Sequence, residues 1–407
     1  MLTDAQRINL DRAVHEYLLS SSHSAAASAF ALSCSSLSDL PPPPPTEAGA
    51  VPPSVPPSVV PLLEKKWVAV VRLQKKVMEL ESLSSVNPTS APPPSSSCPL
   101  PTDTPPPLLL HGHHPNTITS LSLHPTHPLC ASSNSAGAVL VHNTETGQYL
   151  HTLRGHTASV QTVTYNPKGT TLATASSDLS IKLWDTETNE CTRTMRGHDH
   201  TVTGVAFIPP AADVLATSSR DGTVKFWSVK TGYVLHTFTS HGEWVRCLAV
   251  SCCGEEVSSG GSGGDVVVHA VGKREVRGVL KGHTHVVESV AYPPLPKPGA
   301  EAVDLLLATG GRDKTVRLWN TSTLSCLHVY TSHSNWVRTV LFPNHPHHIL
   351  TVSDDHSLMV HSLSTGRTVR KIEEAHGHFV SALAVGGGGD AVVTGGVDGV
   401  AKVWKCR

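Results

Sequence analysis

Histidine, threonine and aspartate, which together can activate a nucleophile, recur in this sequence at set distances from a tryptophan. In four copies a threonine lies ten residues and an aspartate six residues before the tryptophan, and a histidine lies further upstream. The four sets are His156, Thr174, Asp178 and Trp184; His198, Thr217, Asp221 and Trp227; His283, Thr309, Asp313 and Trp319; and His376, Thr394, Asp398 and Trp404. A catalytic triad is assembled once per active site. A set that recurs along the chain is better explained as a structural hydrogen-bonding unit.

Other residues that could do chemistry also have a structural explanation. GGSGG (260–264) satisfies the G-x-S-x-G pattern, but a nucleophile elbow needs a helix after the serine, and the β-rich DVVVHAV follows. The histidine-rich HGHH (111–114) and HPHH (345–348) lack cysteine or carboxylate partners at zinc-site spacing. The nine cysteines form no C-x-x-C pair, and no phosphate-binding loop is present. We expect reduced cysteines, no enzyme activity, no metal and no cofactor.

The residue before the recurring aspartate varies in a way that suggests binding. The stretches RDGTVKFWS and RDKTVRLWN begin with Arg220 and Arg312, whereas other copies have serine, aspartate or valine there. The repeat itself therefore does not require arginine. A single arginine in a turn is usually just solvated, but Arg246 and Trp336 add two more side chains of the types enriched at binding hot spots. We predict that these residues form a basic and aromatic binding surface.

The same spacing identifies three weaker copies. They are His333, Thr351, Asp355 and His361; His241, Ser259, Gly263 and His269; and His114, Ser132, Ala136 and His142. Within one copy, SVQTVTYNP, TLATASS, SIKLWDTET and CTRTMRGH indicate four short strands separated by turns. Seven copies of four strands predict an all-β, seven-bladed propeller, and the recurring side chains resemble the WD-repeat tetrad. Blades one and four lack the aspartate and are expected to be the least rigid.

The sequence also indicates how the ring of blades closes. Only three strands are expected in the last blade, and PLLLHGHH (107–114) resembles the segments that form fourth strands elsewhere. We therefore expect 107–114 to supply the missing strand, which would remove an exposed edge. The insert PPLPKPGAEAVD (293–304) is expected to be a surface loop of blade five.

The region before the propeller is expected to pair two chains. Residues 1–38 predict two short helices that bury little alone, and residues 61–86 have apolar residues at heptad-like intervals. Proline-rich linkers are expected at 39–60 and 87–106, followed by the propeller at 107–407. The expected dimerisation residues are Leu10, Val14, Tyr17, Leu18 and Phe30 in the first segment, and Leu63, Val70, Leu73, Val77 and Leu80 in the second.

This order of elements resembles one known family. The helical segment is similar to a LisH dimerisation motif, with Ser22 and His23 replacing the usual glycine and aromatic residue. LisH, coiled coil, linker and seven WD blades together resemble the lissencephaly-1 family of cytoplasmic dynein regulators. RLQKKVMELES (72–82) carries the resemblance most specifically, and TMRGHDHTV (194–202), HGEWVR (241–246) and SNWVRTVLF (334–342) match in register.

The resemblance implies a homodimer that binds the dynein motor domain and modulates microtubule-based transport, nuclear migration and spindle positioning. It implies dynein contacts at Arg220, Arg246, Arg312 and Trp336, with His356 where the family has a lysine and Tyr233 in a second contact. Further implied partners are coiled-coil adaptors of the NudE type and the catalytic subunits of platelet-activating-factor acetylhydrolase, for which the family is a non-catalytic subunit. The implied location is the cytoplasm, on microtubules, centrosome and spindle.

Two alternatives remain open at the level of sequence. Another LisH/WD-repeat scaffold, such as a ubiquitin-ligase substrate receptor or a transcriptional corepressor, would share the architecture. A diverged copy that has lost function would explain the histidines at three tryptophan positions. The net charge of −1 gives no reason to expect direct binding to nucleic acid or a membrane surface, and no apolar stretch is long enough to span a membrane.

Overall fold

The structure, a computed structural model, describes residues 100–101, 107–110, 116–294, 306–343, 347–386 and 391–406. All of them belong to the compact unit Pro94–Arg407. The helical motif expected at 1–38, the linker at 39–60, the coiled coil expected at 61–86 and all their dimerisation residues lie outside the described residues. His114, most of the second linker and most of the insert in blade five lie outside them as well.

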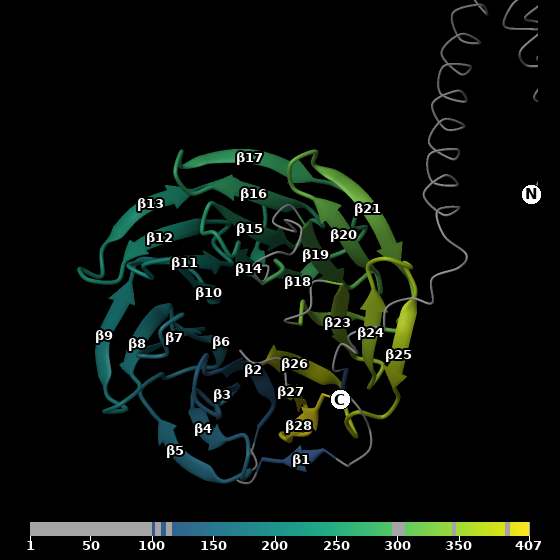
Figure 1. Ribbon diagram of the computed structural model, residues 1–407. Coiled ribbons are helices and arrows are strands. Elements are labelled where there is room, and N and C mark those ends of the chain that lie inside the picture. Colours follow the sequence, from purple (N-terminus) through teal and green to yellow (C-terminus); the bar gives the residue numbers. More distant parts are fainter. Residues whose placement is uncertain are drawn as a thin grey trace, which may run out of the picture. The chain divides into compact units, whose positions relative to one another are not determined.

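Seven four-stranded antiparallel sheets are arranged as the blades of a propeller (Figure 1). The predicted seven-bladed β-propeller is confirmed. Blade one contains β2 (Ile118–Leu123), β3 (Leu129–Asn134), β4 (Val139–Asn143) and β5 (Tyr149–Leu153). Blade two contains β6 (Val160–Tyr165), β7 (Thr171–Ser176), β8 (Ser180–Asp185) and β9 (Cys191–Arg196). Blade three contains β10 (Val202–Ile208), β11 (Val214–Ser219), β12 (Val224–Ser228) and β13 (Val234–Phe238).

The remaining four blades follow in chain order. Blade four contains β14 (Val245–Val250), β15 (Glu256–Gly261), β16 (Val266–Ala270) and β17 (Glu275–Leu280). Blade five contains β18 (Val287–Ala291), β19 (Leu306–Gly311), β20 (Val316–Asn320) and β21 (Ser325–Tyr330). Blade six contains β22 (Val337–Leu341), β23 (His348–Ser353), β24 (Leu358–Ser362) and β25 (Thr368–Ile372), and blade seven contains β26 (Val380–Val385), β27 (Ala391–Gly396), β28 (Ala401–Lys405) and β1 (Leu108–Leu109).

Blade seven is completed by a strand from the other end of the propeller sequence. β1 pairs with β28 in antiparallel register, with Leu108 opposite Val403 and Leu109 opposite Lys402 (Figure 1). The amide of Leu110 then donates to the carbonyl of Ala401 at 3.0 Å, and the Leu110 side chain is buried. The expectation that 107–114 supplies the fourth strand is confirmed for the part of that segment that the structure describes.

The apolar core lies between neighbouring sheets. The second strand of a blade is buried on both faces, as in Thr171–Ser176, whereas outer strands such as Val234–Phe238 are largely exposed. Trp227 of blade three packs with Leu183 and Met195 of blade two, and Trp319 of blade five packs with Val268 of blade four. Each tryptophan therefore joins its own blade to the preceding one.

Successive antiparallel turns alternate between the two ends of a blade. The turns between second and third strands carry Arg220 and Arg312, and they share one end with the connections between blades. We call this end the front face. The turns between first and second strands and between third and fourth strands lie at the opposite end, which we call the back face.

Candidate functional site

A hydrogen-bonded tetrad holds each front-face turn in the four blades with complete sets. His Nδ1 lies 2.8 Å from Asp178, 2.7 Å from Asp221, 2.8 Å from Asp313 and 3.1 Å from Asp398. In blade three, Thr217 Oγ1 lies 2.8 Å from His198 Nε2 and accepts the Trp227 indole N–H at 2.7 Å. Burial would raise the pKa of Asp221, but its bonds to His198 and Thr223 outweigh burial and lower the pKa.

The tetrad geometry is that of a scaffold. The four threonine hydroxyls that a triad would use as nucleophiles belong to residues with no solvent exposure: Thr174, Thr217, Thr309 and Thr394. A nucleophile must reach its substrate, and these cannot. What the tetrad does is fix the turn that begins at the aspartate, and hence the residue immediately before it.

Histidine takes the place of tryptophan in two described tetrads. His361 Nε2 lies 2.9 Å from Thr351 Oγ1, and His269 Nε2 lies 3.0 Å from Ser259 Oγ. Both imidazoles are fully buried, and burial lowers the pKa of each to about 3. Both rings are therefore neutral at pH 7, and the hydrogen bond to the central hydroxyl is retained. In blade one, His142 is likewise buried, but its tetrad histidine is not among the described residues.

In every blade the amide of the residue at the position before the tetrad aspartate donates to the carbonyl of the residue just before the first strand of the same blade. The amide of Arg220 donates to the Thr201 carbonyl at 3.0 Å, and that of Arg312 donates to the Val286 carbonyl at 2.9 Å. The side chains of Arg220 and Arg312 then extend toward the following blade. Arg312 of blade five lies over the Trp336 ring of blade six, with its guanidinium carbon 4.4 Å from the ring centroid.

Trp336 is stacked by a second arginine from its own blade. The guanidinium carbon of Arg338 lies 5.2 Å from the Trp336 centroid. Its Nε and Nη2 donate to the two carboxylate oxygens of the buried Asp354, each at 2.8 Å. Burial favours a lower pKa for Arg338, but Asp354 and Glu288 outweigh burial and raise it. Bidentate pairing of this kind fixes the plane of the guanidinium.

Glu288 of blade five joins arginines from three blades. Its carboxylate accepts from Arg246 Nη2 at 3.2 Å and from Arg312 Nε, and it lies 3.9 Å from Arg338 Nη1. The side chain is only 9% exposed. Burial would raise the pKa of Glu288, but Arg246, Arg312 and Arg338 outweigh burial and lower it, so the carboxylate is ionised. Arg246, Glu288 and Arg338 occupy equivalent positions in consecutive blades, which is why they meet.

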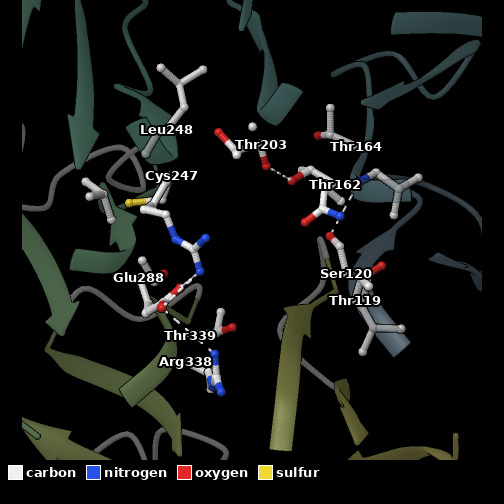
Figure 2. A pocket seen from close by; sticks show the side chains of 18 of the residues that line it. Thr119, Ser120, Thr162, Thr164, Thr203, Cys247, Leu248, Glu288, Arg338 and Thr339 are labelled. Atoms are coloured by element: carbon white, nitrogen blue, oxygen red, sulfur yellow. Dashed lines mark hydrogen bonds and ion pairs between the residues drawn. The ribbon is translucent and has the colours of Figure 1, made fainter. Parts of the chain in front are cut away.

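These equivalent positions line a central cavity of about 610 Å³. Figure 2 shows Glu288 and Arg338 on one side of it, facing the hydroxyls of Thr162 and Thr203 on the other. The hydroxyls donate to backbone carbonyls: Thr162 to Thr203 at 2.6 Å and Thr203 to Val245 at 2.8 Å. The ionic side of the cavity therefore lies in blades four to six, beneath the arginines of the front face.

Arg220 and Trp244 form a second arginine–indole pair. The guanidinium carbon of Arg220 lies 5.2 Å from the Trp244 centroid, and Trp244 is 50% exposed. Arg220 Nε is buried and has no hydrogen-bond partner among the described residues. Burial lowers the pKa of Arg220, and Arg246 and Arg312 lower it further against the opposing effect of Glu288. The four arginines thus share one electrostatic environment.

The structure brings together four of the six residues expected to bind a partner: Arg220, Arg246, Arg312 and Trp336. His356 also lies on the front face, at a positive φ of 67°, and its ring lies 5.6 Å from Phe379 of blade seven. Tyr233, 77% exposed, lies on the back face in the turn between β12 and β13, away from the other five. It cannot act in the same contact.

Sequence reasoning did not single out Trp244, Glu288, Arg338 or Asp354. A signal was present in the repeated H-x-x-W-V-R of 241–246 and 333–338, which places a tryptophan and an arginine at the same two positions of blades four and six. Aligning HTHVVE (283–288) of blade five with these two segments places Glu288 at the arginine position, in the blade between those of Arg246 and Arg338. We call Arg220, Trp244, Arg246, Glu288, Arg312, Trp336 and Arg338 the arginine–tryptophan surface.

The sequence patterns suggestive of other chemistry have ordinary places in the fold. Gly260 and Gly261 end β15, and β16 follows Ser262 after a short turn, so no helix stands behind the serine. Among the described residues, no group of histidine, cysteine and carboxylate side chains could hold a metal ion. In the part of the chain that the structure describes, no helix is long and apolar enough to cross a membrane.

Comparisons with known proteins place these features in context. The family described as "WD domain, G-beta repeat" matches residues 147–185, 189–228, 232–269, 274–320, 324–362 and 366–405. The chain is similar to nuclear distribution protein PAC1 of Coccidioides posadasii, with 34% identity over 79% of this chain and 75% of the relative. It is also similar to PAC1 of Ajellomyces capsulatus (36%; 79% and 76%) and to nuclear distribution protein nudF of Aspergillus niger (33%; 80% and 78%).

Proposed function

The chain belongs to the family of the PAC1 and nudF nuclear distribution proteins, the lissencephaly-1 family of WD-repeat proteins, and we propose that it is a non-catalytic regulator of cytoplasmic dynein. It acts in nuclear migration and microtubule-based transport by binding the dynein motor domain. The observation that carries this proposal is the convergence of Arg220, Arg246, Arg312 and Trp336 from four consecutive blades on one surface.

The chemistry of the surface suits an acidic partner. The four arginines Arg220, Arg246, Arg312 and Arg338 face two buried carboxylates, Glu288 and Asp354, so two positive charges remain. Glu288 engages Arg246 through one terminal nitrogen and Arg312 through Nε, which leaves other guanidinium N–H groups for a partner. Arginine and tryptophan dominate the energetics of many interfaces. A partner that offers carboxylates next to apolar side chains matches both.

The finer features of the proposal follow from the family. The chain pairs as a homodimer through 1–38 and 61–86, and two linked propellers raise the effective concentration of the second binding event. NudE-type adaptors and platelet-activating-factor acetylhydrolase catalytic subunits are further partners, and the protein acts at microtubules, the centrosome and the spindle. Docking biases the motor between conformations, which requires different affinities for those conformations. His356 contributes to the motor contact at the position where the family has a lysine, and Tyr233 serves a separate contact on the back face.

The test is equilibrium binding of the purified full chain to a dynein motor domain at two salt concentrations. The variant Arg220→Ala/Arg312→Ala/Trp336→Ala is expected to lose most of the affinity, because it removes two charges and an indole from the surface. Wild-type binding is expected to weaken with salt, since the contact is partly ionic.

A matched variant controls for general loss of charge and aromatic area. Arg274→Ala/Arg367→Ala/Tyr149→Ala also removes two arginines and one aromatic side chain, all of them exposed and outside the arginine–tryptophan surface. It should bind like the wild type. Equal binding by the wild type and the surface variant would move the contact elsewhere, and lack of binding by the wild type would refute the proposed function.

A further inference from the structure

Trp244 and Trp336 occupy equivalent positions two blades apart. Each lies three residues after the first histidine of its blade's tetrad frame, His241 or His333. Each ring is covered on one side by an arginine of the preceding blade, the one that comes directly before the tetrad aspartate. Arg220 lies over Trp244, and Arg312 lies over Trp336. The Arg220–Trp244 pair therefore repeats the geometry of the Arg312–Trp336 pair, to which the family resemblance assigns the partner contact.

We propose that Trp244 is a direct contact for the same partner, and that it receives an apolar side chain next to a carboxylate that pairs with Arg220. This inference rests on the proposed function and extends the binding surface to blades three and four. The partner would then present two such elements, each an apolar side chain next to a carboxylate. One would bind over Trp244 and the other over Trp336.

The exposure of Trp244 supports a contact over a purely structural role. Apart from Trp244, the large exposed apolar side chains of the described residues lie on outer strands or at the turn residues Leu179 and Tyr233. The structural interaction of Trp244 with the next turn uses its backbone, because its carbonyl accepts the Ser262 amide at 2.9 Å. A smaller side chain would keep that bond. The exposed half of the indole thus remains available to a partner.

The surroundings of Trp244 indicate the chemistry of that partner. Arg220 covers the ring, His200 lies 6.1 Å from it, and Arg246 stands in the same blade. No salt bridge to Arg220 is found among the described residues, whereas Arg246, Arg312 and Arg338 each pair with a carboxylate. A carboxylate of the partner would instead pair with the positive charge of the Arg220 guanidinium, while the aromatic face takes the apolar part of the same segment.

Two roles of Trp244 can be separated by a double-mutant cycle on motor-domain binding with the full chain. A positioning role acts only through Arg220, so Trp244→Ala would have no effect in an Arg220→Ala background. A contact role predicts that Trp244→Ala weakens binding about tenfold or more, as expected for an interface hot spot, and that at least a severalfold loss persists in the Arg220→Ala background. Trp244→Phe should recover part of the loss.

Salt dependence and a control complete the test. The loss caused by Trp244→Ala should be nearly the same at low and high salt, because the lost contact is apolar, whereas the loss caused by Arg220→Ala should shrink at high salt. Tyr149→Ala, which removes an exposed ring from blade one, should bind like the wild type. If the wild type binds and Trp244→Ala binds equally well, or if its effect disappears in the Arg220→Ala background, the inference is overturned and the proposed function stands. If the wild type does not bind, the proposed function fails, and the inference with it.

Discussion

Replacing His361 by tryptophan should make the propeller less sensitive to acid, provided that Ser332 is changed to glycine at the same time. In blades two, three and five the tetrad tryptophan packs against a glycine, and a Cβ on Gly155, Gly197 or Gly282 would lie 2.9–3.2 Å from the indole. Blade six has serine at that position and histidine in place of tryptophan. The two positions are coupled through Thr368, whose hydroxyl lies 2.7 Å from Ser332 Oγ and 3.1 Å from His361 Nδ1.

The expected magnitude follows from the pKa of His361. Burial lowers that pKa to about 3 in the folded protein, whereas a histidine in the unfolded chain titrates near its ordinary pKa of about 6.5. Between these two values only the unfolded state binds the proton, so the stability that the neutral ring provides above pH 6.5 falls as the pH drops. At roughly 1.4 kcal/mol per pH unit, His361 should cost about 2 kcal/mol of unfolding free energy between pH 7 and pH 5.

The measurement is urea unfolding followed by circular dichroism at pH 7 and pH 5. Ser332→Gly/His361→Trp should lose about 2 kcal/mol less than the wild type over that interval, since it removes one such histidine. His361→Trp alone should be destabilised by only about 1 kcal/mol at pH 7. Ser332 narrows the space for the indole, but Trp404 of blade seven packs beside Ala375 at the same position. His347→Gln, which removes an exposed histidine from the same blade, is the control and should behave like the wild type. An unchanged pH dependence in the double variant would refute the reasoning.

Three further outcomes are expected. Thr217→Val should lower the unfolding free energy by about 2–4 kcal/mol, because His198 Nε2 and the Trp227 indole N–H would both lose a buried partner; Thr223→Val, whose side chain is partly exposed, should cost less. Leu110→Ala should cost about 2–5 kcal/mol by thermal or urea unfolding, and a negligible cost would contradict its role in ring closure. Glu288→Gln should destabilise the protein and shift the backbone amide signals of blades four to six in NMR spectra, because three arginines lose their shared negative charge. Unchanged stability would mean that the arginines do not need this carboxylate.

The repeated side chains made the fold predictable. Strand lengths, the number of blades and the closing strand all follow from the spacing of tetrad residues and from the segment around Leu108. The arginine–tryptophan surface was predictable only in part. Arg220 and Arg312 stood out because other blades have no arginine at that position. Glu288, by contrast, is one acidic residue in an ordinary strand pattern, and its role becomes visible only when the arginines of three blades are seen to meet at it.

The replacement of tryptophan by His361 in blade six was even harder to interpret from the sequence. Histidine at position 361 looks like a loss when it is compared with the tryptophans of other blades. Its compensation depends on Ser332 and Thr368, which lie on different segments and meet only in the folded blade. The only sequence signal is that serine precedes the first tetrad histidine in both blades four and six, at Ser240 and Ser332, where three tryptophan-containing blades have glycine.

The pairing of β1 with β28 has a consequence for the order in which the propeller can form during translation. β1 emerges from the ribosome before any other propeller strand, and its partner emerges last. Domains generally fold as units while the chain is being made, but this ring cannot close until synthesis has passed Lys405. Until then Leu108 and Leu109 have no partner strand and the last finished blade keeps an open edge, which is the kind of transient surface that chaperones protect. Premature termination between blade one and β28 would remove the partner of β1 and leave the ring open.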